Sequence, residues 1–307
     1  MTGLVLGAAA AVRSPKGQGP GPADDPVALG WFQDLLGPFG AKADEELLRR
    51  GAAVRHHELA DRLAAAEGVR TSRPQLLIVT HALPDVVPFT AVAPYLTARL
   101  GGTTPVAACF AIGQQGLAAP FTALRIAAAF RRAGRATEVV LAVLEQTTLP
   151  TPFPLVHDTP LVDSAAALVL GPAPHEPGEG WELLRVASDA SVGAAGSLGS
   201  AGSIGSALRR EAARDGTLVV LGSWVAESVA DALPEGSAVH RTAPGSYCTG
   251  VWLELAENRQ KWQSAYRRAM LCDTDPRTGH SHLAVFGPPS TRDSNGTRDG
   301  NGTGDGR

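Results

Sequence analysis

The chain alternates short, uninterrupted apolar runs with longer segments in which apolar residues recur at helical spacing. The runs at 75–80, 138–144, 165–170 and 217–222 are too short for helices and lack the alternation of a half-exposed strand. Strands that are buried on both faces have this pattern, because helices cover both sides of their sheet. The pattern therefore predicts an α/β protein with buried sheets.

Further segments fit this succession of strands and helices. An apolar run that ends at Val12 predicts a first strand, 13–30 is rich in Gly and Pro and predicts a loop, and 105–113 predicts another buried strand. Apolar residues at helical spacing predict the helices, one of which is strongly apolar and is closed by Gly134. The predicted helices are 31–67, 90–100 and 117–133.

The second half of the chain repeats the first in a fainter form. The strand 217–222 resembles 75–80, and the turn 243–250 with the apolar helix after it resembles 107–133. The strand 282–286 then matches 138–144 in the same order. A duplicated strand-helix unit is therefore predicted, with helices on both faces of the sheets.

The repeat sets the predicted organisation of the chain. It divides into an N-terminal half, 1–171, and a shortened C-terminal half, 172–287. The Gly/Ser/Ala segment 192–206 predicts a flexible loop near the surface or at an active-site rim. From 288 to 307 the residues offer too little apolar surface for an ordered core, so this tail is predicted to be disordered.

Composition and charge exclude several classes of protein. With 44% hydrophobic residues, 19% charged residues and a net charge of -3, the chain can bury a core and has no electrostatic footprint for nucleic acid. No charge occurs between Arg99 and Arg125, but Pro and polar residues break this stretch, so we interpret it as buried core and not as a membrane span. No positive residue precedes the N-terminal apolar run, which argues against a signal peptide.

The spacing of the cysteines and histidines argues against a structural metal site. Three cysteines without a C-x-x-C pair argue against a disulfide framework or a cysteine zinc site, and they fit a cytoplasmic protein. His56 and His57 are interpreted as surface residues, and His240 as a solvated loop residue. His280 and His282 alternate on the last strand, with no thiol or carboxylate on that strand at ligand spacing, although two aspartates, Asp273 and Asp275, are placed in the loop before it. No metal and no cofactor are predicted.

Several of these segments together resemble ketosynthase III proteins of the thiolase superfamily. The resemblance rests on 77–84, on 96–101, on the strand, Gly turn and buried helix that end at Ala136, and on 163–171, where Val162-Asp163-Ser164 replaces a Gly-Asp-Gly stretch. In the C-terminal half it is weaker and rests on 244–250 and on the final strand to Gly287. It implies a thiolase-like fold with two duplicated halves in a layered α-β-α-β-α arrangement, a dimer, and acyl thioesters of coenzyme A or acyl carrier protein as ligands. For Asp163 it implies a structural role, in which hydrogen bonds fix a turn.

The family places a nucleophilic Cys at the N-terminus of the buried helix, where the helix dipole and free backbone N–H groups lower the thiol pKa. The matching position is Gln114, because Gly116 then falls on the glycine two residues after the Cys. Cys109 lies upstream, inside the predicted strand, and is interpreted as a small buried apolar residue. It remains an alternative nucleophile.

The other two catalytic positions of the family also differ in this chain. The family has a His after a strand of the type 218–221, where this chain has Gly222, and an Asn in a turn, where it has Ser246. His and Asn stabilise the enolate that forms on decarboxylation. The resemblance also makes Gly116 and Gly245 candidate substrate-binding residues. His81 follows the strand 75–80, where it either lines a pocket or packs in the core.

Three functions remain open at this point. The first is a degenerate, non-condensing subunit of fatty-acid or polyketide-type metabolism that forms a homodimer, or a heterodimer with an active ketosynthase. The second is an acyltransferase or decarboxylase that acts on acyl-CoA or acyl carrier protein through Gln114, Cys109 or Ser246. The third is a scaffold that binds acyl carrier protein without chemistry.

Overall fold

Ten strands form one continuous sheet in the computed structural model, which describes residues 3–15, 17, 21–87, 89–101, 106–172, 180–189 and 204–289. The strand order is β3-β2-β4-β5-β1-β6-β10-β9-β7-β8. The strands are β1 (Val5–Arg13), β2 (Leu76–His81), β3 (Ala108–Ile112), β4 (Val139–Glu145), β5 (Ser164–Gly171), β6 (Glu182–Asp189), β7 (Thr217–Leu221), β8 (Ala238–Arg241), β9 (Arg268–Thr274) and β10 (Ser281–Gly287).

The sheet consists of two half-sheets with the same topology. Counted outward from the centre, the N-terminal half-sheet runs β1-β5-β4-β2-β3 and the C-terminal one runs β6-β10-β9-β7-β8. Between them, β1 pairs with β6 at the single position Val5↔Glu182. The predicted duplication is thereby confirmed at the level of strand order.

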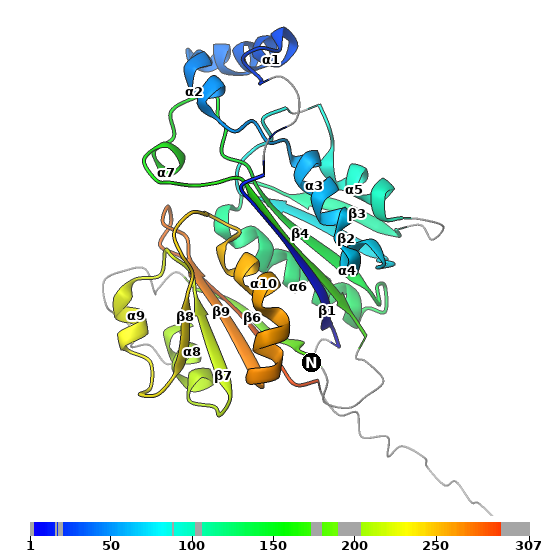
Figure 1. Cartoon of the computed structure of the whole chain (residues 1–307), viewed down its shortest axis with the longest axis vertical. Helices are drawn as coiled ribbons and strands as arrows, with labels where there is room; N and C mark the ends of the chain where they lie inside the picture. The colour runs from blue at the N-terminus through cyan, green and yellow to red at the C-terminus, as the bar shows by residue number, and fades with distance from the viewer. Residues whose placement is uncertain are drawn as a thin grey trace, which may run out of the picture.

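Helices form three layers around the two half-sheets (Figure 1). In the middle, α6 and α10 each pack against strands of both half-sheets. On the outer sides, α3, α4 and α5 cover the N-terminal half-sheet and α8 covers the C-terminal one. This is the α-β-α-β-α arrangement that the sequence predicts. The helices are α1 (Pro26–Leu36), η1 (Gly37–Phe39), α2 (Glu45–Arg50), α3 (His56–Ala65), α4 (Glu67–Arg70), α5 (Val92–Leu100), η2 (Gly116–Ala118), α6 (Ala119–Arg132), α7 (Pro154–His157), α8 (Ile204–Ala212), α9 (Glu227–Asp231) and α10 (Gly250–Ala265).

The hydrophobic core follows these layers. One cluster fills the middle layer, where Phe121 of α6 packs against Trp252 of α10 with ring centroids 4.9 Å apart. In each half, one further cluster lies beneath the outer helices. Because β4 and β5 are buried along their whole lengths, their sequences are continuous apolar runs rather than alternating ones.

Three sequence predictions need correction. The last strand, β10, is the counterpart of β5, and β4 has its counterpart in β9, a strand that the pattern analysis did not identify. The strand β3 is shorter than predicted and lies at the edge of the sheet, with alternating residues exposed. Residues 204–206 begin α8 instead of ending a loop, while 190–203 and the tail from 290 onward lie outside the described residues.

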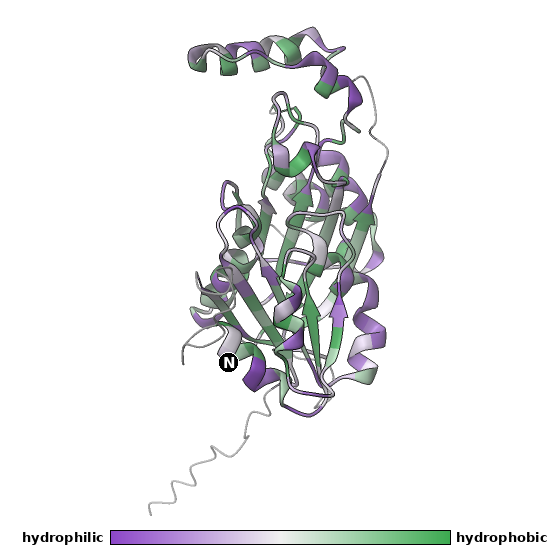
Figure 2. Cartoon of the chain, turned by 90° about the vertical axis from the view of Figure 1, so that its left-hand side faces the viewer, coloured by the Kyte–Doolittle hydropathy of each residue, from purple (hydrophilic) through white to green (hydrophobic). Residues whose placement is uncertain are grey.

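A helical arm, α1 with η1, stands at one end of the molecule (Figures 1 and 2). Asp25 caps α1 by accepting hydrogen bonds from the backbone N–H groups of Val27 and Ala28. The arm leaves several apolar side chains exposed, among them Leu35 and Phe39. No described helix is long and apolar enough to span a membrane.

Candidate functional site

The turns before the two central helices meet in the middle of the molecule. Gly116, at the turn from β3 into α6, has a φ of +54°, which glycine adopts without strain. A Cβ placed on Gly116 would lie 2.5 Å from the Tyr247 hydroxyl oxygen and 2.6 Å from Asp275 Oδ2. The start of the α6 turn therefore faces two polar side chains of the C-terminal half.

Tyr247 and Asp275 form a buried hydrogen-bonded pair. The Tyr247 hydroxyl donates to Asp275 Oδ2 at 2.9 Å, and the other carboxylate oxygen accepts the backbone N–H of Arg277 at 2.8 Å. Burial and the negative charge of Asp275 raise the pKa of Tyr247 far above its usual value. Tyr247 is therefore a neutral hydrogen-bond donor, fully used by its partner.

A second carboxylate fills the space beside Gly222. A Cβ on Gly222 would lie 2.0 Å from Asp273 Cγ, so the aspartate occupies the place that a side chain at 222 would need. Asp273 is almost fully buried on β9, and not in the preceding loop as predicted. Burial, with the nearby charges of Asp275 and Glu145, raises the pKa of Asp273 to about 8.

Glu145, at the end of β4, caps the N-terminus of α10. Its carboxylate accepts the backbone N–H groups of Tyr247, Cys248 and Thr249 at 2.6, 2.6 and 3.2 Å. This arrangement satisfies the free donors at a helix start and places a negative group at the positive end of the helix dipole. Burial nevertheless raises the pKa of Glu145 above its usual range.

The turn before α10 is held from several sides. The Trp224 indole N–H donates to the backbone carbonyl of Ser246 at 2.9 Å, and the carbonyl of Gly245, whose φ is +132°, accepts the N–H of Val162 at 2.9 Å. Ser246 itself is buried. The structure thus places Gly116 against Tyr247, the residue that follows Ser246, although the two turns are far apart in the sequence, while Gly222 lies against Asp273.

The predicted nucleophile candidates lie outside this centre. Gln114 is exposed in the turn after β3, with a φ of +61° that is unusual for a residue with a side chain. Cys109 is exposed on β3, so its interpretation as a buried residue is wrong: β3 lies at the edge of the sheet, where this side chain remains accessible.

Cys248 and Cys272 both lie beside the centre, and burial raises the pKa of the Cys272 thiol as well. Cys248 directly follows Tyr247. Its Sγ lies 3.7 Å from the backbone carbonyl of Leu144, and burial, followed by the charge of Glu145, raises the pKa of the thiol well above its usual value. A nucleophile must be a thiolate, which this environment disfavours. The centre holds carboxylates and a phenol, and within the described residues it has no activated thiol and no histidine.

The histidines also need correction. His56 is 2% exposed rather than a surface residue. His240 lies on β8 instead of in a loop, and its Nε2 is 2.8 Å from Glu254 Oε2. His282 is buried on β10, where Nδ1 is 2.8 Å from Ser188 Oγ. His81 contacts the turn before α6, because a Cβ on Gly113 would lie 2.9 Å from its ring.

No described group of three or more His, Cys, Asp or Glu residues could hold a metal ion.

Asp163, which the resemblance predicts to fix a turn, does so: its Oδ1 accepts the N–H and hydroxyl of Thr147 at 2.6 and 2.8 Å. Its contribution is therefore structural.

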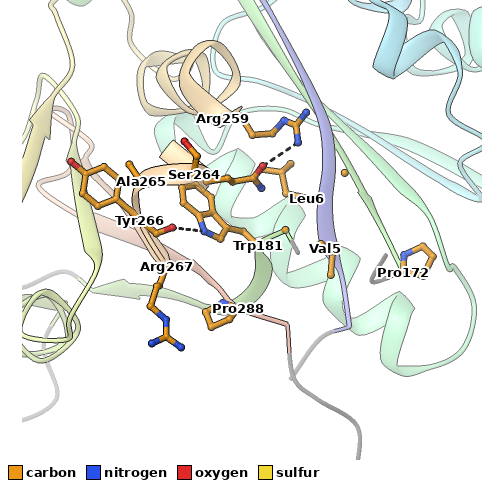
Figure 3. A pocket seen from close by; sticks show the side chains of 13 residues that line it. Val5, Leu6, Pro172, Trp181, Arg259, Ser264, Ala265, Tyr266, Arg267 and Pro288 are labelled. Atoms are coloured by element: carbon orange, nitrogen blue, oxygen red, sulfur yellow. Dashed lines mark hydrogen bonds between the residues drawn. The ribbon is translucent and has the colours of Figure 1, made fainter. Parts of the chain in front are cut away.

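A further cavity lies elsewhere. It has a volume of about 800 Å³ and lies beside the first residues of β1 and the end of α10 (Figure 3). There the Trp181 indole donates to the Tyr266 carbonyl at 3.2 Å and Arg259 donates to Gln263 at 3.2 Å. None of the residues predicted for the site lines it.

Sequence reasoning missed the residues that fill the centre, namely Glu145, Tyr247 and the two aspartates. The signal for Glu145 was present, since a carboxylate that directly follows a fully buried strand must lie inside the protein. Tyr247 carried no such signal, because a turn residue before a helix is normally at the surface.

Comparison with solved structures identifies the fold. The 3-oxoacyl-(acyl carrier protein) synthase III of Pseudomonas aeruginosa matches with a TM-score of 0.56 and 15% identity over 94% of this chain and 98% of that one. The corresponding enzyme of Aquifex aeolicus gives 0.57 and 12% over 92% and 99%. OleA of Xanthomonas campestris, in a structure with bound lauric acid and lauroyl-CoA, gives 0.54 and 13% over 92% and 98%. No family model and no curated protein sequence matches the chain. The chain therefore has the thiolase-like fold of ketosynthase III enzymes.

Proposed function

We propose that this chain, with its ketosynthase III fold, is a non-condensing subunit that handles acyl thioesters together with a second ketosynthase-type subunit. One observation carries the proposal: the position that matches the family's nucleophile holds Gln114, an amide that is exposed in the turn after β3, while the Tyr247–Asp275 pair fills the space beside Gly116. An amide side chain does not provide the nucleophile that a covalent acyl intermediate needs. Asp273 likewise takes the space of a side chain at Gly222, where the family has its histidine.

The chemistry of the centre supports the same proposal. Condensation needs a nucleophile and donors that stabilise an enolate oxygen. Here the Tyr247 hydroxyl is already bound to Asp275, and the N–H groups at the start of α10 are bound to Glu145. Potential donors are therefore engaged by the protein's own carboxylates.

An exposed edge supports a partner subunit. On β3 and beside it, Ala107, Cys109 and Ala111 are exposed, and β3 pairs with no strand on its outer side. Unpaired apolar edges promote strand pairing with another chain. On the other edge strand, β8, His240 is hydrogen-bonded to Glu254 and Arg241 forms an ion pair with Glu227. We propose that β3 is the contact with a second copy or with an active ketosynthase.

The name of one structural neighbour, a 3-oxoacyl-(acyl carrier protein) synthase III, and the lauroyl-CoA bound in another extend the proposal to the ligand. Acyl carrier protein or coenzyme A thioesters are accordingly the proposed partners, in a cytoplasmic setting. The proposed division is 1–171 and 172–287, which matches the two half-sheets.

The chemistry can be tested by intact-mass spectrometry after incubation with acetyl-CoA and malonyl-CoA, and with the corresponding acyl carrier proteins. We expect no covalent adduct and no release of CO₂. An adduct that disappears in Cys109→Ala would favour the acyltransferase alternative. Decarboxylation that is lost in Gln114→Ala would favour the decarboxylase alternative.

The contact can be tested by sedimentation of matched edge variants. Cys109→Asp on β3 is expected to separate the protein into monomers, whereas Val239→Asp on β8, another half-exposed edge position, should leave the assembly unchanged. A monomeric parent protein that also captures no ketosynthase would contradict the proposed contact.

A further inference from the structure

A smaller cavity lies between the arm and the N-terminal half-sheet, apart from the Tyr247 centre. Its volume is about 340 Å³, within the range of small-molecule sites. The arm, the residues after β2 and the start of α5 form most of its wall. The apolar lining comprises Trp31, Phe32, Leu35, Pro84, Ala91, Val92, Ala111 and Pro150.

Two buried side-chain atoms in this wall, one on His56 and one on Asp85, lack hydrogen-bond partners among the described residues. His56 and Asp85 both line the cavity. Asp85 Oδ1 accepts the backbone N–H of His56 at 3.1 Å, and Asp85 Oδ2 lies 3.8 Å from His56 Nδ1, beyond hydrogen-bond distance. Among the described residues, neither Asp85 Oδ2 nor His56 Nε2 has a hydrogen-bond partner, and both atoms are buried.

The surroundings determine what these atoms can bind. His56 is 2% exposed, and burial, with its neighbours His81 and His57, lowers its pKa to about 3, so the ring is neutral. A proton on Nδ1 faces the Asp85 carboxylate, which leaves Nε2 as an acceptor. An acceptor that is buried without a donor costs free energy, and a ligand that supplies the donor removes this cost.

His81 completes the polar wall from the other side. Its Nδ1 lies 2.9 Å from the Leu83 carbonyl, an acceptor, so this nitrogen carries the proton. Its ring centroid is 4.9 Å from that of His56. The cavity therefore combines aromatic and aliphatic walls with acceptor nitrogens at one end.

We propose that this cavity binds a small apolar molecule carrying a hydroxyl group, whose O–H donates to His56 Nε2 while its apolar body packs against Trp31 and Phe32. Nothing in the proposed non-condensing function requires this site. A neutral donor fits better than an ammonium group, because a buried cation would also have to be desolvated within apolar walls.

Equilibrium dialysis with three matched probes tests the proposal. They are 2-naphthol, naphthalene without a donor, and 2-(aminomethyl)naphthalene with a cationic donor. We expect saturable binding of 2-naphthol, about tenfold tighter than that of naphthalene, the size of one buried hydrogen bond. Equal affinity of the two would overturn the role of His56, and tighter binding of the amine would overturn the hydroxyl assignment in favour of a cation held by Asp85.

Two variants tie the binding to the cavity. His56→Phe should weaken 2-naphthol about tenfold and leave naphthalene unchanged, with His280→Phe at an exposed position as the control. Should His56→Phe fail to fold, Ala91→Phe places a ring in the cavity from the exposed residue just before α5, and Ala98→Phe, exposed on α5 and outside the cavity, is its control. Unchanged 2-naphthol binding in Ala91→Phe would overturn the site.

Discussion

The starts of the two central helices, α6 and α10, are counterparts in the duplicated fold, yet a buried carboxylate makes different contacts at each. At α10 the carboxylate of Glu145, from the opposite half, accepts three backbone N–H groups directly. At α6 the corresponding carboxylate is Asp275, which follows β9 as Glu145 ends β4, and it accepts the Tyr247 hydroxyl beside Gly116. The N-cap residues of η2, α6 and α10 make no side-chain capping hydrogen bond, so the two helix starts differ in what the carboxylate of the opposite half contacts.

The two buried acids, Glu145 and Asp275, therefore have different structural roles. Glu145 stabilises a helix end, and its loss would leave donors buried without partners. Asp275 stabilises a side chain that closes a space. Glu145 of the N-terminal half therefore mainly stabilises the fold at the centre. Asp275 of the C-terminal half holds the Tyr247 side chain that fills the space beside Gly116.

The largest effect is expected from Glu145→Ala. Three buried N–H groups would lose their acceptor, so the free energy of unfolding should fall by about 3–5 kcal/mol. Urea denaturation measures this change. Glu235→Ala, at an exposed position, is the control and should change stability by less than about 0.5 kcal/mol. A loss for Glu145→Ala no larger than that of the control would contradict the capping role.

The buried carboxylate of Asp273, two residues before Asp275, should be recognisable in the pH dependence of stability. The pKa of Asp273 is about 8 in the folded protein, against 3.8 as its ordinary value, so the folded state keeps a proton that the unfolded state releases between these pH values. Stability from this residue therefore falls as pH rises from about 4 to 8, by at most about 1.4 kcal/mol per pH unit. Asp273→Asn should remove that slope in denaturation curves recorded from pH 5 to 8; parallel slopes in parent and variant would exclude the effect.

A smaller effect is expected from Tyr247→Phe. The ring remains packed while Asp275 Oδ2 loses its donor, which should cost about 1–2 kcal/mol. Thermal unfolding of Tyr247→Phe, Asp275→Asn and the double variant gives the coupling between the two groups. Additive losses would show that the hydrogen bond contributes nothing to stability.

The smallest change concerns the exposed edge. Cys109→Ala should alter the free energy of unfolding by less than about 0.5 kcal/mol, because the side chain is exposed. In dilute protein, iodoacetamide should label Cys109 but not the buried Cys248 and Cys272, whose pKa values are raised by burial. Labelling should slow as protein concentration rises and β3 becomes covered; a rate independent of concentration would contradict the proposed contact at β3.

Much of the fold was predictable because buried strands carry a strong pattern. The runs that became β2, β4, β5 and β7 were identified from apolar continuity alone. In contrast, β9 was missed since Arg268 and Asp273 interrupt its apolar residues, and β8 is short and partly polar. The exposure of β3 could not be predicted, because an apolar strand at an edge has the same sequence pattern as one in the interior.

Less of the candidate site was predictable. The positions Gly116, Gly222 and Ser246 were chosen from the sequence, and the structure places Gly116 against Tyr247, next to Ser246 in the chain, and Gly222 against Asp273. What fills the space between them depends on contacts over long sequence separations, such as Tyr247 with Asp275 and Glu145 with Cys248. His56 was misplaced for a similar reason, because the Asp85 loop and the arm cover a helix start that appears exposed in the sequence.

The capping of α10 by Glu145 also has a consequence for the order of folding. The acid and the N–H groups that it binds are 102 to 104 residues apart in the chain. During synthesis, β4 therefore leaves the ribosome long before its helical partner exists, with a carboxylate at the end of a strand whose central face is still uncovered. The N-terminal half cannot complete its packing before the C-terminal half has been synthesised. Contacts between residues so far apart in the sequence slow folding. Chaperones that shield apolar surfaces would thus be needed most between the synthesis of residues 145 and 250.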